Sequence, residues 1–98
     1  MKDIIAIKRF KRFLQTEKGL SPNSIYSYIY DLKKFSDFLA NKNKTILNAS
    51  QDDVEQFLFF EKNKKRNSAR TLARSLAAIR QFYNYMSSIE NITNPTVK

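Results

Sequence analysis

The sequence predicts an all-α domain, and the composition and the spacing of apolar residues carry that prediction. The chain has 98 residues, of which only one is glycine and two are proline, so it is poor in the residues that turns between strands favour. Apolar residues recur at helical spacing in four separate segments. The 42% hydrophobic content, with eight Phe and five Tyr, is enough for one packed domain.

The first half of the chain is expected to form two helices. The first covers residues 3–18, where lysines and arginines lie between the apolar positions. Gly19 is suited to end it in the left-handed backbone conformation. Ser21 is suited to cap a helix and Pro22 to occupy its first position. Together they predict a second helix that extends to about Asn41.

Two further helices are expected in the second half. Ser50 caps the third, with Asp53 three residues later as the capping-box partner. The basic loop 63–67 (NKKRN) ends that helix. Ser68 caps the fourth, which is expected to run to about Ser88.

The expected helical domain occupies residues 1–90, and residues 91–98 are interpreted as a linker. Asn94 is followed by Pro95, and a proline biases the residue before it away from helix. We expect this linker to lead to a further domain that the chain does not contain.

Residue types that are missing limit the possible chemistry. The chain has no cysteine and no histidine, which excludes disulfides, thiolate metal sites and a Ser–His or Cys–His nucleophile. Asp52 and Asp53 are better explained as helix-start residues than as a catalytic pair. We therefore expect no catalytic residue, no cofactor and no metal in this chain.

No apolar run is long enough to cross a membrane, and the start does not resemble a signal peptide, so a cytoplasmic location is expected.

The positive charge is unevenly distributed. The net charge is +9, and a strongly basic surface favours phosphate or anionic lipid as a partner. Residues 63–88 hold six lysines and arginines and no acidic residue, whereas residues 46–62 hold four acids and one lysine. Ordinary exposed helices usually mix the two signs.

The predicted fourth helix combines arginines with short side chains. Arg70 and Arg74 are one turn apart, and Ala77 and Ala78 follow. Small residues allow close approach to a groove, and arginine can bind phosphate or guanine. An ordinary solvated helix face is the alternative. If Arg74 reads a base, its replacement by alanine should weaken duplex binding by roughly 1–3 kcal/mol and leave the thermal midpoint nearly unchanged.

Two strings in this chain resemble one known domain family. Residues 17–39 (EKGLSPNSIYSYIYDLKKFSDFL) and 68–86 (SARTLARSLAAIRQFYNYM) are similar to the second and fourth helices of the N-terminal core-binding domain of tyrosine recombinases, of the Xer and phage-integrase type. The resemblance implies a four-helix orthogonal bundle, a SAM-like core-binding domain. It also implies that helices 2 and 4 dock in the major groove of a recombination half-site.

The resemblance further implies the partners and the contact residues. The partners are double-stranded DNA and other recombinase subunits in a synaptic complex, with the isolated domain monomeric and no membrane involved. The strand-transfer chemistry, through a phosphotyrosine, belongs to the family's C-terminal domain, so the parent protein is expected to be a tyrosine recombinase. Phe59 and Phe60 are interpreted as core residues in preference to a subunit contact. The candidate DNA-binding residues are Ser24, Tyr26, Ser27, Tyr30 and Lys33 in the second helix, and Lys64, Arg66, Arg70, Thr71, Arg74 and Ala78 in the fourth helix and the loop before it.

Two other readings stay open at this point. A helical protein–protein interaction module with an acidic partner predicts tight binding to a protein and weak, sequence-blind binding to DNA. A basic helix lying on a membrane surface would need a large apolar face left unburied. The four predicted helices are amphipathic enough to cover one another, so this reading ranks last.

Overall fold

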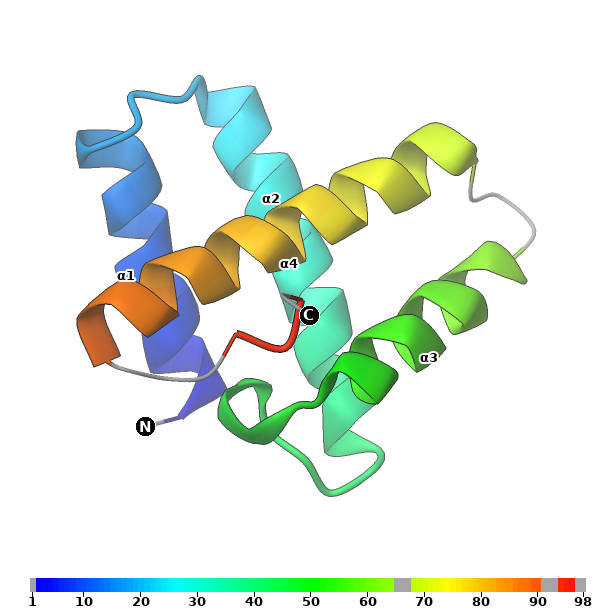
Figure 1. Cartoon of the computed structure of the whole chain (residues 1–98). Coiled ribbons are helices and arrows are strands. Elements are labelled where there is room, and N and C mark those ends of the chain that lie inside the picture. The colour runs from blue at the N-terminus through cyan, green and yellow to red at the C-terminus, as the bar shows by residue number, and fades with distance from the viewer. Residues whose placement is uncertain (1, 65–67, 91–93, 97–98) are drawn as a thin grey trace.

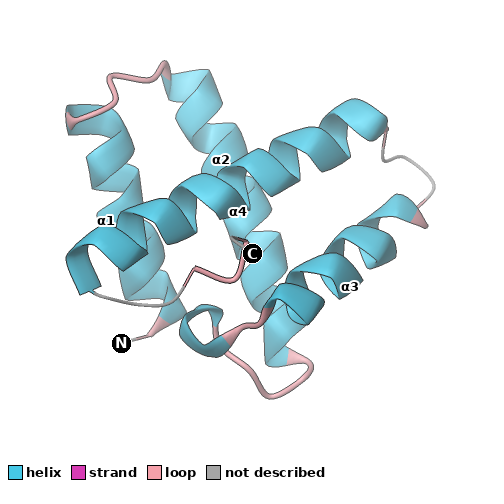
Figure 2. Cartoon of the chain, in the orientation of Figure 1, coloured by secondary structure: helices cyan, strands magenta, loops and turns pink. Residues whose placement is uncertain are grey.

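The computed structural model describes residues 2–64, 68–90 and 94–96, and in that part of the chain every regular element is helical (Figure 2). This confirms the all-α prediction and the expected number of helices. The elements are α1 (Asp3–Thr16), α2 (Pro22–Ala40), the short 3-10 helix η1 (Ile46–Asn48), α3 (Gln51–Lys62) and α4 (Ala69–Glu90).

Helix α2 is the centre of the bundle, because it contacts α1, α3 and α4. Figure 1 shows α4 crossing in front of α1 and α2, with α3 lying beside its first half. Aromatic rings join α1 to α4: the Phe10 and Phe82 ring centroids are 5.5 Å apart, and those of Phe13 and Tyr85 are 4.6 Å apart. The interior is therefore one continuous core to which all four helices contribute. Its largest fully buried apolar and aromatic side chains are Phe10, Leu14, Leu32, Phe35, Leu39, Ile46, Phe57, Ile79, Phe82, Tyr83 and Met86.

The helix ends follow the local signals in the sequence. Gly19 has φ +60° after α1, the left-handed conformation that glycine adopts without cost. The Ser21 hydroxyl accepts a hydrogen bond from the Ser24 amide at the start of α2. Ser50 and Asp53 form the expected capping box at the start of α3. The predicted helix boundaries differ from the observed ones by two residues at most, as at α1, which ends at Thr16.

A buried polar contact fixes η1 to the core. The Tyr83 hydroxyl donates to the Ile46 carbonyl over 2.6 Å, and the Asp3 carboxylate accepts from the Ile46 amide and from the Ser36 hydroxyl. Burial raises the pKa of Tyr83, and the nearby Asp3 and Asp53 carboxylates raise it further. Tyr83 is therefore a neutral structural residue.

Asp53 forms a second polar centre, between the α2–α3 connection and α3. Its carboxylate accepts from Lys42 over 2.9 Å and from Lys44 over 2.7 Å, as well as from Ser50. Burial alone would raise the pKa of Asp53, but these hydrogen bonds lower it far below the ordinary value. The network attaches the connection to the first turn of α3.

The expectation for Phe59 and Phe60 was wrong. Phe59 is 67% exposed and Phe60 is 48% exposed, because α3 directs Val54, Phe57 and Glu61 inward and Phe59 falls on the opposite side of the helix. Phe60 is partly covered by a ring contact with Phe38 and by Lys64, whose amino group lies over the ring.

The described part of the predicted linker, residues 94–96, lies against the bundle. Pro95 is buried and lines a hollow between α3 and α4, and the Asn94 amide donates to the Asn84 side chain over 2.8 Å. That residues 91–98 connect to another domain stays a prediction.

Candidate nucleic-acid interface

The first halves of α2 and α4 meet at a shallow polar hollow of about 310 Å³. Asn23, Ser24, Ser27 and Tyr28 line it from α2, and Arg74 lines it from α4. The hollow therefore brings three predicted site residues, Ser24, Ser27 and Arg74, to one place on the surface. Hydroxyl groups and a guanidinium are side chains that commonly bind DNA phosphates and base edges.

Asp31 holds Arg74 in this hollow. The Arg74 Nε and Nη2 atoms donate to the two carboxylate oxygens of Asp31 over 2.8 and 3.1 Å. Asp31 is fully buried, whereas 40% of the Arg74 side chain is exposed. The hydrogen bond to Asp31 raises the pKa of Arg74, against the opposing effect of burial. Two parallel hydrogen bonds fix the plane of the guanidinium and leave its other N–H groups without a partner in that pair.

This ion pair contradicts the expectation that Arg74 contributes nothing to the stability of the fold. An alanine at this position would leave the buried Asp31 carboxylate unpaired, which is costly. The thermal midpoint is therefore expected to fall, where the sequence alone predicted almost no change. Asp31 itself has no signal in the sequence, because the two partners are 43 residues apart.

Ala78 does not contribute a side chain to the surface. It is completely buried, on the side of α4 that packs on the bundle, so the expected contact with DNA through Ala78 is corrected. Its small side chain is explained by the close approach of packed helices. Ala77, one residue earlier, is half-buried.

The other predicted residues on α4 and its preceding loop have mixed surroundings. Arg70 is exposed, and Thr71 is half-buried with its amide bonded to the capping Ser68 hydroxyl. Lys64 contacts Glu61 over 2.7 Å and lies over the Phe60 ring. Arg66 lies outside the described residues.

Glu61 orients two lysines near the end of α3. Its side chain is 1% exposed, and it pairs with Lys34 from α2 as well as with Lys64. Burial opposes ionisation of Glu61, but hydrogen bonds and charge from the two lysines lower its pKa overall. Lys34 also stands over the Tyr30 ring. The lysines are therefore held at the surface by one buried carboxylate.

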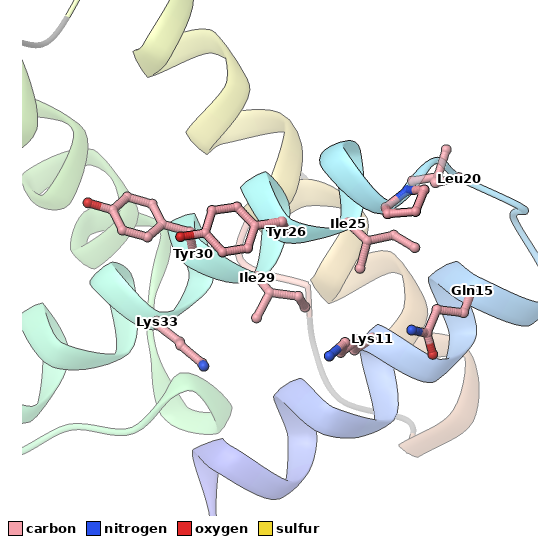
Figure 3. A pocket seen from close by; sticks show the side chains of 9 residues that line it. Lys11, Gln15, Leu20, Ile25, Tyr26, Ile29, Tyr30 and Lys33 are labelled. Carbon is pink, nitrogen blue, oxygen red and sulfur yellow. The ribbon is translucent and has the colours of Figure 1, made fainter.

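The remaining α2 candidates lie on the other flank of that helix. Tyr26, Tyr30 and Lys33 line a second hollow of about 690 Å³, between α1 and α2 (Figure 3). Lys11 and Gln15 form its α1 wall, and sequence reasoning assigned neither of them to the site. The run of basic residues between the apolar positions of α1 was the signal that could have found Lys11.

A membrane-spanning helix and a metal-binding cluster of acidic side chains are both absent from the described part of the chain. No helix there combines the length and apolar character needed to cross a bilayer. No group of three or more acidic side chains there lies close enough together to hold a metal ion.

Comparison with known proteins gives one consistent family. Residues 7–89 match the family described as phage integrase, N-terminal SAM-like domain. The chain is 39% identical over 92 residues to tyrosine recombinase XerC of Herpetosiphon aurantiacus, covering 92% of this chain and 30% of the relative. It is 32% identical over 83 residues to tyrosine recombinase XerD of Oceanobacillus iheyensis, covering 83% of this chain and 28% of the relative. No solved structure matches the chain. The chain thus spans less than a third of the length of these curated relatives.

Proposed function

This chain belongs to the family of phage integrase N-terminal SAM-like domains, and we propose that it is the DNA-binding domain of a site-specific tyrosine recombinase. In this proposal the first halves of α2 and α4 dock in the major groove of a recombination half-site. The strand-transfer chemistry belongs to the rest of the parent enzyme in this proposal, since the chain has no histidine.

The observation that carries the proposal is the geometry around Arg74. A buried carboxylate directs its guanidinium into a hollow that Ser24 and Ser27 also line. A preoriented arginine loses little side-chain freedom on binding, and the N–H groups that Asp31 does not bind suit two acceptors on a guanine edge or one phosphate. Residues 63–88 carry no acid that would repel the DNA backbone from this side.

Electrostatics supplies most of the affinity in this proposal. Arg70 is exposed one turn before Arg74, and Lys34 and Lys64 are held near the end of α3. If about five to eight phosphates are contacted, the affinity falls steeply as salt rises. Binding by the domain alone would be weak, and a second DNA-binding domain in the same chain would raise it through effective concentration.

Other recombinase subunits are the second proposed partner. Phe59 and Phe60 leave an exposed aromatic patch on α3, and aromatic side chains are enriched at the centres of protein interfaces. We propose that this patch contacts a neighbouring subunit once both are bound to DNA. Phe59→Ser should then reduce cooperative binding to paired half-sites without changing the affinity for one half-site.

The test of DNA binding is a salt titration with fluorescent duplexes. Fluorescence anisotropy would measure the dissociation constant between 50 and 200 mM salt, where about six contacts predict a loss of roughly a thousandfold. Arg70→Ala should weaken binding without loss of stability. A dissociation constant that does not change with salt would refute the proposal. Tight binding to an acidic protein, with only weak binding to any duplex, would favour the interaction-module reading instead.

A further inference from the structure

The residues that line the hollow between α1 and α2 are suited to bind a polyanion that also has flat apolar groups. Lys11 and Lys33 stand on opposite walls, with Gln15 beside Lys11, and Figure 3 shows both amino groups turned toward the space between the helices. None of the residues that line the hollow is acidic. The floor is apolar, formed by buried residues such as Ile25 and Ile29, which are 6% and 9% exposed.

Two exposed tyrosines form the rim of the hollow. Tyr26 is 72% exposed and Tyr30 is 49% exposed, and their rings stack at 6.4 Å with an angle of 17° between the planes. The stacked rings therefore form one exposed aromatic surface beside the hollow. Tyrosine hydroxyls bond phosphates and sugars, and the ring faces can pack against the deoxyribose.

The position of the hollow on α2 suggests which part of DNA would occupy it. An α-helix with its side chains is about 10–12 Å wide, which matches the major groove of about 12 Å. A helix in that groove has one phosphate backbone along each flank. One flank of α2 carries the Arg74 hollow, and the other carries the hollow with Lys11 and Lys33.

We infer that the α1–α2 hollow binds the second phosphate backbone that borders the major groove. In this arrangement Lys11 and Lys33 neutralise phosphates, Gln15 and the Tyr26 hydroxyl bond phosphate oxygens, and the tyrosine rings contact the sugars. Helix α1 is thereby part of the DNA interface. The inference rests on the proposed function, because it needs α2 to lie in the groove.

A matched pair of lysines provides the first test. Lys18 follows α1 and lines a different hollow, which α4 residues such as Gln81 and Asn84 complete. Lys11→Ala should weaken binding to a 25-base-pair duplex of mixed sequence by about five- to tenfold at 0.1 M salt and reduce the salt slope by about 0.9. Lys18→Ala should change neither. Both lysines are exposed, so circular dichroism and the thermal midpoint should match those of the unmodified chain.

A second test does not depend on charge. The chain has no cysteine, so Lys11→Cys and Lys18→Cys each supply a single thiol whose alkylation by a neutral maleimide can be timed. Saturating duplex should slow alkylation at least tenfold in K11C and leave K18C unaffected.

The outcomes separate the two proposals. If the unmodified chain shows no salt-dependent binding to duplex DNA, the proposed function fails. If it binds but K11A behaves as K18A and duplex does not protect K11C, the inference about α1 is overturned and the function stands. If polyglutamate of the same charge slows the alkylation of K11C as much as the duplex does, the inference is also overturned. The hollow would then be assigned to an acidic protein partner.

Discussion

Replacing Arg74 by alanine should destabilise the domain as well as weaken its binding to DNA. The change removes two charge-assisted hydrogen bonds of 2.8 and 3.1 Å and leaves the fully buried Asp31 without its cation. Breaking a buried pair in this way costs about 3–5 kcal/mol. Because 40% of the Arg74 side chain is exposed, water can reach the site, and we reduce the expected loss to about 2–3 kcal/mol.

That loss is large for a chain of this size but should not unfold it. A domain of about 100 residues has a free energy of unfolding of roughly 5–15 kcal/mol, and each 1 kcal/mol lowers the midpoint by about 4–8 °C. We therefore expect Arg74→Ala to melt roughly 10–20 °C lower and to remain folded at 25 °C.

Urea denaturation followed by circular dichroism would measure the change, and a double-mutant cycle would assign it. Asp31→Ala, Arg74→Ala and the double variant should give a coupling energy of about 2 kcal/mol. Arg74→Lys keeps the charge but loses the paired donors, so its stability should lie between the two extremes. The exposed Arg70→Ala is the control, with a change within about 0.5 kcal/mol. An Arg74→Ala domain as stable as the unmodified one would show that the ion pair does not support the fold.

Three further predictions concern the core. Ser75→Ala should raise the free energy of unfolding by about 0.5–1.5 kcal/mol, because the buried Ser75 hydroxyl has no hydrogen-bond partner among the described residues and alanine favours helix; a loss in urea denaturation would contradict this. Tyr83→Phe should cost about 1–2 kcal/mol in the same assay, since it leaves the Ile46 carbonyl buried without a donor. The folded-state pKa of Asp53 is lowered, so the ionised Asp53 carboxylate stabilises the fold. This contribution to the free energy of unfolding is complete above the unfolded pKa of about 3.9 and is lost as the pH falls below that value. In the Asp53→Asn variant the thermal midpoint should therefore fall less steeply below pH 4 than in the unmodified chain. An equally steep fall in both would show that other carboxylates cause the acid destabilisation.

The helices were predictable from sequence because their signals are local. Ser50 and Asp53 are three residues apart and form a capping box. Gly19 follows the first helical segment with a positive φ, a backbone conformation that favours glycine. Phe59 and Phe60 were misplaced because hydrophobicity alone does not say which side of a short helix is covered. The 12-residue α3 packs one face on the bundle, and neighbouring apolar residues cannot all lie on it.

The candidate site was less predictable, because it depends on contacts between segments far apart in sequence. The spacing of Arg70, Arg74 and Ala78 on one helix did not reveal that Ala78 is buried and that Asp31 pairs with Arg74. Nor did it reveal that Tyr26 and Arg74 line different hollows on opposite flanks of α2. That the predicted contacts bind DNA stays a prediction.

The contacts of Asp3 have a practical consequence for anyone who produces this domain. Its carboxylate accepts from the Ile46 amide and the Ser36 hydroxyl, so the beginning of the chain is fastened to two segments more than thirty positions away. An expression fragment trimmed by only three amino acids would release both attachments. Affinity tags should therefore be joined upstream of an intact beginning, with a spacer long enough to leave that carboxylate in place.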